Sequence, residues 1–189
     1  MKKSFYTLLA ALLFPSIALA HPGHDIANFA GGFSHPFTGI DHLLVMLAVG
    51  YWAGKSQTAA KWQVPVQFTL FMLVGIVLGA VLTGMAFVEL AIAVSVLAMG
   101  LVILLNTQIN TVVQLILASV FAVLHGFVHG QEMIATGGGF AAVGGIILAT
   151  MLLLGAGVYL ATFKNTIGLY LQRGLATLLT LSGTYLLFT

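Results

Sequence analysis

Long apolar runs with almost no charge dominate this 189-residue chain and decide what it can fold into. Apolar residue types make up 60% of the chain and charged types only 5%, whereas roughly a quarter of an ordinary soluble domain is charged. Four acidic and six basic side chains cannot cover the surface of a water-exposed globule. The outside must therefore meet lipid over most of its area, which excludes a cytosolic enzyme and a disordered tail.

The apolar runs predict an all-α membrane protein, a bundle of six transmembrane helices. We expect these helices at about residues 38–54, 64–85, 87–105, 111–129, 140–162 and 167–188. Most runs approach the ~20 residues that a spanning helix needs, and they lack the alternation of apolar and polar side chains found in barrel strands. Two small-residue motifs, Gly75-x-x-x-Gly79 and Gly126-x-x-x-Gly130, predict faces where helices approach closely.

The first twenty residues have the pattern of a secretory signal peptide. The positive pair Lys2-Lys3 precedes a short apolar run at residues 8–14, and Ala18-Leu19-Ala20 fits the small-x-small cleavage rule. A short first transmembrane helix is the alternative, but this run is too short to span ~30 Å of hydrocarbon. We therefore expect residues 1–20 to be removed, so that the mature chain begins with His21 outside the membrane.

Two independent signals give the orientation of the remaining chain. Cleavage places the new N-terminus outside, and six crossings then place the connections 55–63, 106–110 and 163–166 inside. All basic residues of the mature chain lie in or near those connections: Lys55, Lys61, Lys164 and Arg173. This distribution agrees with the positive-inside rule and shares no residue with the signal-peptide argument.

In this topology every histidine and every carboxylate of the mature chain falls on the outer side. These residues are His21, His24, Asp25, His35, Asp41, His42, Glu89, His125, His129 and Glu132. Ionisable groups near membrane depth are costly, and they usually mark an ion path or a catalytic site. Because imidazole suits nickel, cobalt, copper and zinc, the pattern predicts a site for a divalent transition-metal ion.

The histidines of the fourth expected helix have the most informative spacing. His125 and His129 are four residues apart and so share a helix face, on which Glu132 also lies if the helix continues. The alternative is a pair of histidines hydrogen-bonded to neighbouring helices. His21 and His24 are weaker candidates, because terminal histidines are often only solvated, and at best they would collect metal.

Asp41 has a competing explanation at the start of the first expected helix. Thr38 and Asp41 resemble a capping box, and an acid in the first turn suits the helix dipole. Capping explains neither the adjacent His42 nor the upstream His35. Glu89 also lies at the start of an expected helix, where an acid suits the helix dipole. For both carboxylates, a role at the helix start and a role in metal binding remain alternatives.

At these residues the chain resembles a known family. His35-Pro-Phe-Thr-Gly-Ile-Asp41-His42 and His125-Gly-Phe-Val-His129-Gly-Gln-Glu132 are similar to the two signature motifs of the HupE/UreJ family, and Val88-Glu89-Leu90-Ala91 resembles its third marked segment. Members are secondary nickel permeases associated with hydrogenase or urease genes, and some are thought to carry cobalt. The resemblance implies metal-handling roles for His35, Asp41, His42, Glu89, His129 and Glu132. His125 would support them.

The resemblance further implies that residues 21–189 form one transmembrane metal-transport domain in the bacterial inner membrane. Its partners would be Ni²⁺, or Co²⁺ in some members, and the lipid bilayer, with no resident cofactor and no nucleic acid; a homo-oligomer is left open. The chain has no Gly-x-x-x-x-Gly-Lys-[Ser/Thr] loop, so it is not expected to hydrolyse ATP. The inner half of the ion path has no charged ligand. Its candidate ligands are neutral polar side chains such as Asn106, Gln108, Asn110 and Gln114.

Two other functions would use the same residues. In an intramembrane zinc-dependent hydrolase, Glu132 or Glu89 would activate water beside the metal. A metal-binding membrane sensor is less well supported, because the sequence offers no soluble output domain. The residues alone do not separate the hydrolase from the permease, and the family resemblance favours the permease.

Overall fold

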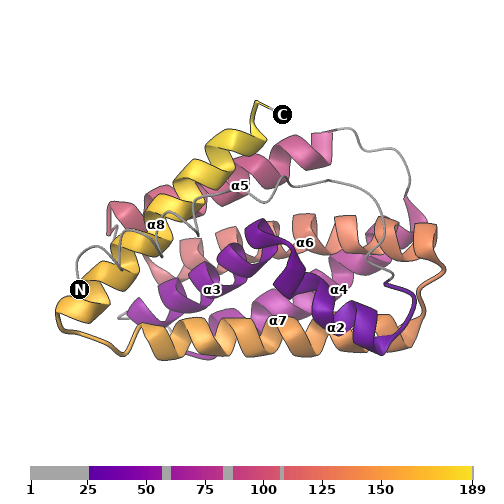
Figure 1. Ribbon diagram of the computed structural model, residues 1–189, viewed down its shortest axis with the longest axis horizontal. Helices are drawn as coiled ribbons and strands as arrows, with labels where there is room; N and C mark the ends of the chain where they lie inside the picture. The colour runs from indigo at the N-terminus through magenta and orange to yellow at the C-terminus, as the bar shows by residue number, and fades with distance from the viewer. Residues whose placement is uncertain (1–25, 57–60, 83–86, 107–108, 189) are drawn as a thin grey trace, which may run out of the picture.

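The computed structural model describes residues 26–56, 61–82, 87–106 and 109–188 (Figure 1). These parts of the chain contain seven α-helices and no strand, so the all-α prediction is confirmed. The helices are α2 Phe29–Thr38, α3 Ile40–Lys55, α4 Gln63–Val81, α5 Phe87–Leu104, α6 Thr111–Thr136, α7 Phe140–Leu160 and α8 Thr166–Leu186. The expected signal peptide, along with His21 and His24, lies outside the described residues.

Four helices, α4 to α7, are long and apolar enough to cross a membrane. The helices α2 and α3 meet at 82° and qualify only together, as one broken span. With this pair, the described residues contain up to five candidate membrane spans. Helix α8 is 21 residues long, but Gln172 and Arg173 lie in its first half and make it less apolar. The structure therefore supports a multi-pass helical membrane protein, while the sixth span stays a prediction.

The helix bounds differ from the sequence prediction at both histidine motifs. Residues 29–38, which lie almost entirely before the first predicted helix, form α2, and α3 begins only at Ile40 after Gly39 interrupts the helix. Helix α6 continues to Thr136 instead of ending near residue 129. The apolar run of α6 ends before the polar residues that follow His129, but the helical backbone continues to Thr136. Gly137, with a left-handed φ of 69°, ends the helix.

Glycines make the closest helix contacts. Gly75 and Gly79 of α4 face Gly126 and Gly130 of α6, and a Cβ built on any of the four would collide with the backbone of the other helix. The two predicted small-residue faces are thus confirmed, and they pack against each other. Close contacts at glycines also join α3 to α7 and α5 to α8, and Figure 1 shows α8 crossing α5 on one side of the bundle.

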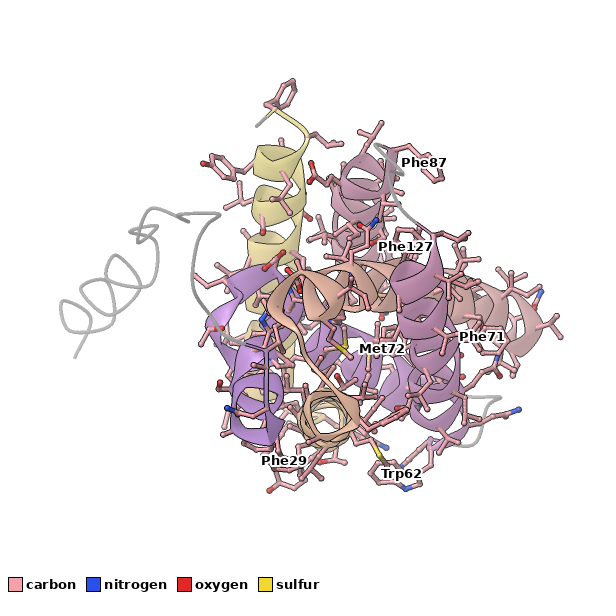
Figure 2. All side chains as sticks on the ribbon, turned by 90° about the vertical axis from the view of Figure 1, so that its right-hand side faces the viewer. Phe29, Trp62, Phe71, Met72, Phe87 and Phe127 are labelled. Atoms are coloured by element: carbon pink, nitrogen blue, oxygen red, sulfur yellow. The ribbon has the colours of Figure 1, made fainter. Side chains whose placement is uncertain are left out.

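Apolar side chains cover the outside of the bundle as well as its core. Figure 2 shows Trp62, Phe71 and Phe87 at the periphery, where each is exposed, whereas Met72 is fully buried. An exposed apolar surface of this extent suits contact with lipid chains. Polar groups inside such a bundle therefore need a specific explanation.

Candidate metal centre

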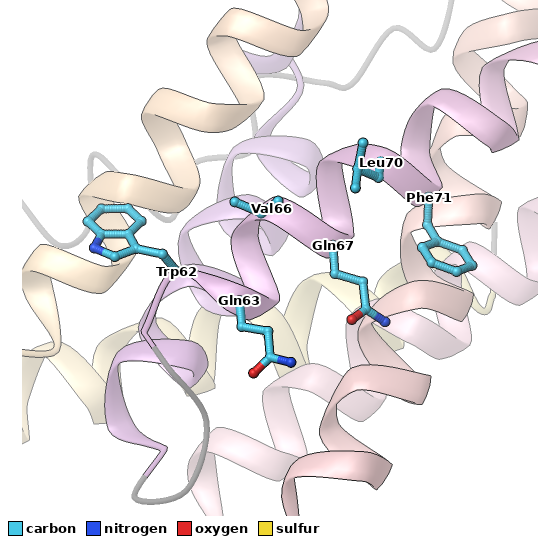
Figure 3. Close-up of a pocket in the computed structure, with 6 residues that line it drawn as sticks. All are labelled: Trp62, Gln63, Val66, Gln67, Leu70 and Phe71. Atoms are coloured by element: carbon cyan, nitrogen blue, oxygen red, sulfur yellow. The ribbon is translucent and has the colours of Figure 1, made fainter.

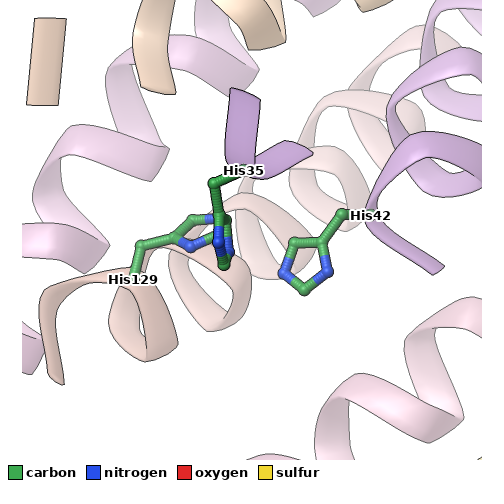
Figure 4. Close-up of side chains that lie close together, drawn as sticks. All are labelled: His35, His42 and His129. Carbon is green, nitrogen blue, oxygen red and sulfur yellow. The ribbon is translucent and has the colours of Figure 1, made fainter. Parts of the chain in front are cut away.

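Three histidines from three different helices converge inside the bundle. His35 lies near the end of α2, His42 in the first turn of α3 and His129 in α6 (Figure 4). One ring nitrogen of each lies within 4.8 Å of those of the other two. The ring centroids are 5.0 Å apart for His35 and His129, and 4.9 Å apart for His42 and His129. His129 is buried, and the other two rings are half-buried.

The bend between α2 and α3 brings the first two histidines together. In a straight helix, residues seven positions apart lie about 10.5 Å apart along the axis. The 82° bend at Gly39 instead places the rings of His35 and His42 with their centroids 5.5 Å apart. This bend was not predicted from the sequence, although a glycine directly after Thr38 is a recognised signal for a helix interruption.

Carboxylate oxygens orient two of the three imidazole rings. The Nδ1 of His42 donates to Asp41 Oδ1 at 3.1 Å, and the Nδ1 of His129 donates to Glu132 Oε2 at 3.3 Å. An imidazole whose Nδ1 proton is held in this way offers the lone pair of Nε2. Histidines that bind metals almost always have such a partner on the other nitrogen.

Several buried ring nitrogens in this cluster have no hydrogen-bond partner among the described residues. They are both ring nitrogens of His35 and the Nε2 of His42. The Nε2 of His35 lies 3.4 Å from Glu132 Oε2, yet the two are not aligned for a hydrogen bond. A buried polar atom without a partner costs about 1–3 kcal/mol, and a cation among the three rings would use one nitrogen lone pair of each ring.

The capping-box explanation of Asp41 is wrong. The N-cap of α3 is Gly39, and no side chain among the described residues caps this helix. The Thr38 hydroxyl instead donates to the carbonyl of His35 at 2.9 Å. Asp41 does lie in the first turn of α3, where an acid suits the helix dipole, but its carboxylate is bound to His42.

The remaining predicted residues lie at different distances from the three histidines. His125 is buried beside them, with its ring centroid 5.8 Å from that of His42, and its Nδ1 donates to the Phe121 carbonyl at 2.8 Å. That carbonyl partner has no signal in the sequence, because any residue supplies one. Glu89 is exposed in the first turn of α5, and within the described chain it makes no hydrogen bond or ion pair with the histidines.

A separate open groove of about 680 Å³ runs along α4 (Figure 3). It is lined by Trp62, Gln63, Val66, Gln67, Leu70 and Phe71. None of these side chains is ionisable, so the groove offers no ligand suited to a transition-metal ion. The histidine cluster is therefore the better candidate for the functional site.

Apolar helices around a buried group of histidines, two of them oriented by carboxylates, define a helical membrane protein with an ionisable centre. The family model described as HupE / UreJ protein matches residues 9–186. The chain is also 40% identical over 158 residues to Protein HupE of Rhizobium leguminosarum bv. viciae, which covers 84% of this chain and 83% of that protein. No solved structure matches the chain significantly.

The chain therefore belongs to the HupE/UreJ family, a family of nickel and cobalt permeases. This membership confirms the resemblance seen in the two histidine motifs. It supports metal transport at the level of the family, and a transporter rather than an enzyme.

Proposed function

We propose that this protein is a secondary permease that takes up Ni²⁺, or Co²⁺, across the bacterial inner membrane through an outward-facing site at His35, His42 and His129. The observation that supports it best is the convergence of three imidazole nitrogens within 4.8 Å. Bonds between imidazole nitrogen and a transition metal of this kind are about 2.0–2.1 Å long, so two nitrogens on one ion are at most about 4.2 Å apart. Small side-chain rotations would bring the rings onto one ion.

The neighbouring carboxylates would balance the charge of the ion. Asp41 and Glu132 each hold one histidine of the cluster, and together they carry two negative charges against the two positive charges of the cargo. This balance reduces the cost of removing the ion from water into a low-dielectric interior. Imidazole ligands in turn discriminate against Mg²⁺ and Ca²⁺, which prefer oxygen.

The membrane potential would be sufficient to drive accumulation. Moving one charge across 100 mV is worth about 2.3 kcal/mol, so a divalent ion gains about 4.6 kcal/mol. Each 1.4 kcal/mol corresponds to a tenfold ratio, and the potential alone therefore supports accumulation of more than a thousandfold. Such a gradient is ample for a trace metal.

The test is nickel uptake into vesicles containing the purified protein, together with Ni²⁺ binding to the same variants. His129→Ala and Glu132→Gln should abolish uptake at limiting nickel, because the first removes a ligand and the second removes the negative charge beside that ligand. His24→Ala should have a milder effect. Gln131→Ala, in the same turn of α6, is the matched control for a general disturbance of the helix.

Two outcomes would contradict the proposal, provided that protein levels and thermal unfolding match the parent. Normal nickel uptake by both His129→Ala and Glu132→Gln would show that the site is wrong. Uptake no greater than in empty vesicles, combined with cleavage of a peptide or lipid substrate, would favour the intramembrane zinc-dependent hydrolase.

A further inference from the structure

A second polar cluster lies at the opposite ends of α3 and α6 from the histidines. The amide Nε2 of Gln114 donates to the backbone carbonyl of Trp52 at 3.4 Å. Trp52 is ten residues after His42 in α3, and Gln114 is eleven residues before His125 in α6. Each separation corresponds to about 15–17 Å along the helix. The two helices therefore run antiparallel and are joined by side chains at two levels, about three turns apart.

The orientation of the Gln114 amide is determined by its partner. Exchanging its nitrogen and oxygen would place two acceptors against each other, so the nitrogen must face the Trp52 carbonyl. Within the part of the chain that the structure describes, the Oε1 atom is then the one that has no donor, and it belongs to a side chain that is only 1% exposed. An unpaired buried acceptor costs about 1–3 kcal/mol, which points to a ligand that this oxygen would contact.

The surroundings of Gln114 favour a cation as that ligand. Trp52 lies in the last turn of α3, where the helix dipole gives a partial negative charge. Transporters use helix C-terminal ends and carbonyl oxygens of this kind to hold small cations. The basic residue of this turn, Lys55, lies over the Tyr51 ring, with its Nζ 5.3 Å from the ring centroid.

Further neutral oxygens surround the same end of α3. The Tyr51 hydroxyl donates to Gln172 Oε1 of α8 at 3.4 Å, and Gln172 Nε2 donates to the carbonyl of Ile103 near the end of α5 at 3.0 Å. Helices α3, α5, α6 and α8 therefore meet here through neutral polar groups. Neutral oxygens bind a divalent ion weakly, mostly through its water shell, in contrast to the imidazoles at the other end.

Small side chains connect the two levels along one face of α6. Ala118 and Ala122 follow Gln114 at intervals of four residues and share its helix face with His125. Both alanines are fully buried, so this face is occupied by methyl groups between the polar levels. Between the histidines and Gln114 this face of α6 therefore carries only small apolar side chains.

We propose that Gln114 Oε1 and the C-terminal end of α3 form a second station for the divalent cation, through which the ion leaves the histidine site. This inference rests on the proposed transport function. A strong site followed by a weak one suits conduction, because an ion must enter readily and still be released. Gln114 would then control the rate of uptake, whereas the histidines control affinity.

The first test compares Gln114→Leu with Gln67→Leu in vesicles loaded with a nickel-sensitive dye. Gln67 is the matched control, because it also loses a side-chain hydrogen bond at a helix contact, in its case with Ser119 Oγ at 2.7 Å. Gln114→Leu should lower the uptake rate at saturating Ni²⁺ at least tenfold, while Ni²⁺ affinity at equilibrium stays within twofold of the parent. Equal uptake by the two variants would overturn the proposal.

The second test separates a cation station from a helix cap. Gln114→Glu keeps an oxygen but loses the N–H donor that holds the Trp52 carbonyl, so a mere cap would be lost. A cation station should instead bind Ni²⁺ more strongly, because the glutamate adds a negative charge. The number of Ni²⁺ ions bound per full-length chain in detergent should then rise by one. The same increase is expected in a His129→Ala background, where the histidine site is impaired.

A folded Gln114→Glu variant that binds no additional Ni²⁺ would refute the second station. This measurement needs no transport, so it also decides the matter if Gln114→Leu fails to fold. Failure of the parent protein to bind or take up Ni²⁺ would instead contradict the proposed function. The two failures are therefore distinguishable.

Discussion

Gly126 lies between the two α6 histidines and directly against α4, so one added methyl group tests how far the site depends on helix spacing. A Cβ built on Gly126 would overlap the Met72 carbonyl oxygen, and it would lie 2.9 Å from the carbon of that carbonyl and 3.0 Å from the Ile76 nitrogen, whereas ordinary contact begins at 3.4 Å. Both are backbone atoms and cannot rotate away. In Gly126→Ala, α4 and α6 must therefore separate by at least about 0.5 Å near His125 and His129.

That displacement is large compared with what a metal site tolerates. Metal–ligand distances are defined to about 0.2 Å, and functional groups need to be held within about 0.5 Å. We expect Gly126→Ala to weaken Ni²⁺ binding about tenfold, which corresponds to about 1.4 kcal/mol. Overpacking should also destabilise the protein by about 1–3 kcal/mol. Isothermal titration calorimetry and thermal unfolding in detergent measure the two effects.

Gly174→Ala in α8 is the matched control. A Cβ there would have no atom within 4 Å, and alanine is the better helix former by about 1 kcal/mol. This variant should bind Ni²⁺ like the parent and be no less stable. If Gly126→Ala binds Ni²⁺ as tightly as Gly174→Ala, then the spacing of α4 and α6 does not position the histidines, and the reasoning is refuted.

Two predictions concern processing and topology. The intact mass of protein extracted from membranes should correspond to a chain that begins at His21, and retention of residues 1–20 would place the N-terminus inside and reverse the topology. The sequence has no native cysteine, so single cysteines can report sidedness to an impermeant thiol reagent in intact cells. Thr166→Cys should be shielded from the reagent, and Gly139→Cys should be labelled. Both positions tolerate the change, since Thr166 is exposed and an added Cβ at Gly139 meets nothing within 4 Å. The opposite labelling would contradict an outward-facing histidine site.

Helix formation was predictable because it depends on neighbours in the sequence. Continuous apolar runs predicted α4, α5, α6 and α7, and most ends of these helices lie within a few residues of the prediction. Such runs indicate helices because a segment in lipid must form all its backbone hydrogen bonds within itself. The spacing of His125 and His129 likewise placed both rings on one face of α6. The small-residue motifs indicated close contacts, and the structure shows that the two motifs pack against each other.

The composition of the candidate metal centre was decided only by the tertiary structure. His35 joins the cluster because the chain bends by 82° at Gly39, whereas His125 lies beside the three converging rings although it shares a helix face with His129. The role of Gln114 also depends on a contact with Trp52, sixty-two residues away. Periodicity reports which side chains share a face of one helix, but the meeting of side chains from different helices depends on bends and crossing angles, which arise from packing between segments distant in sequence.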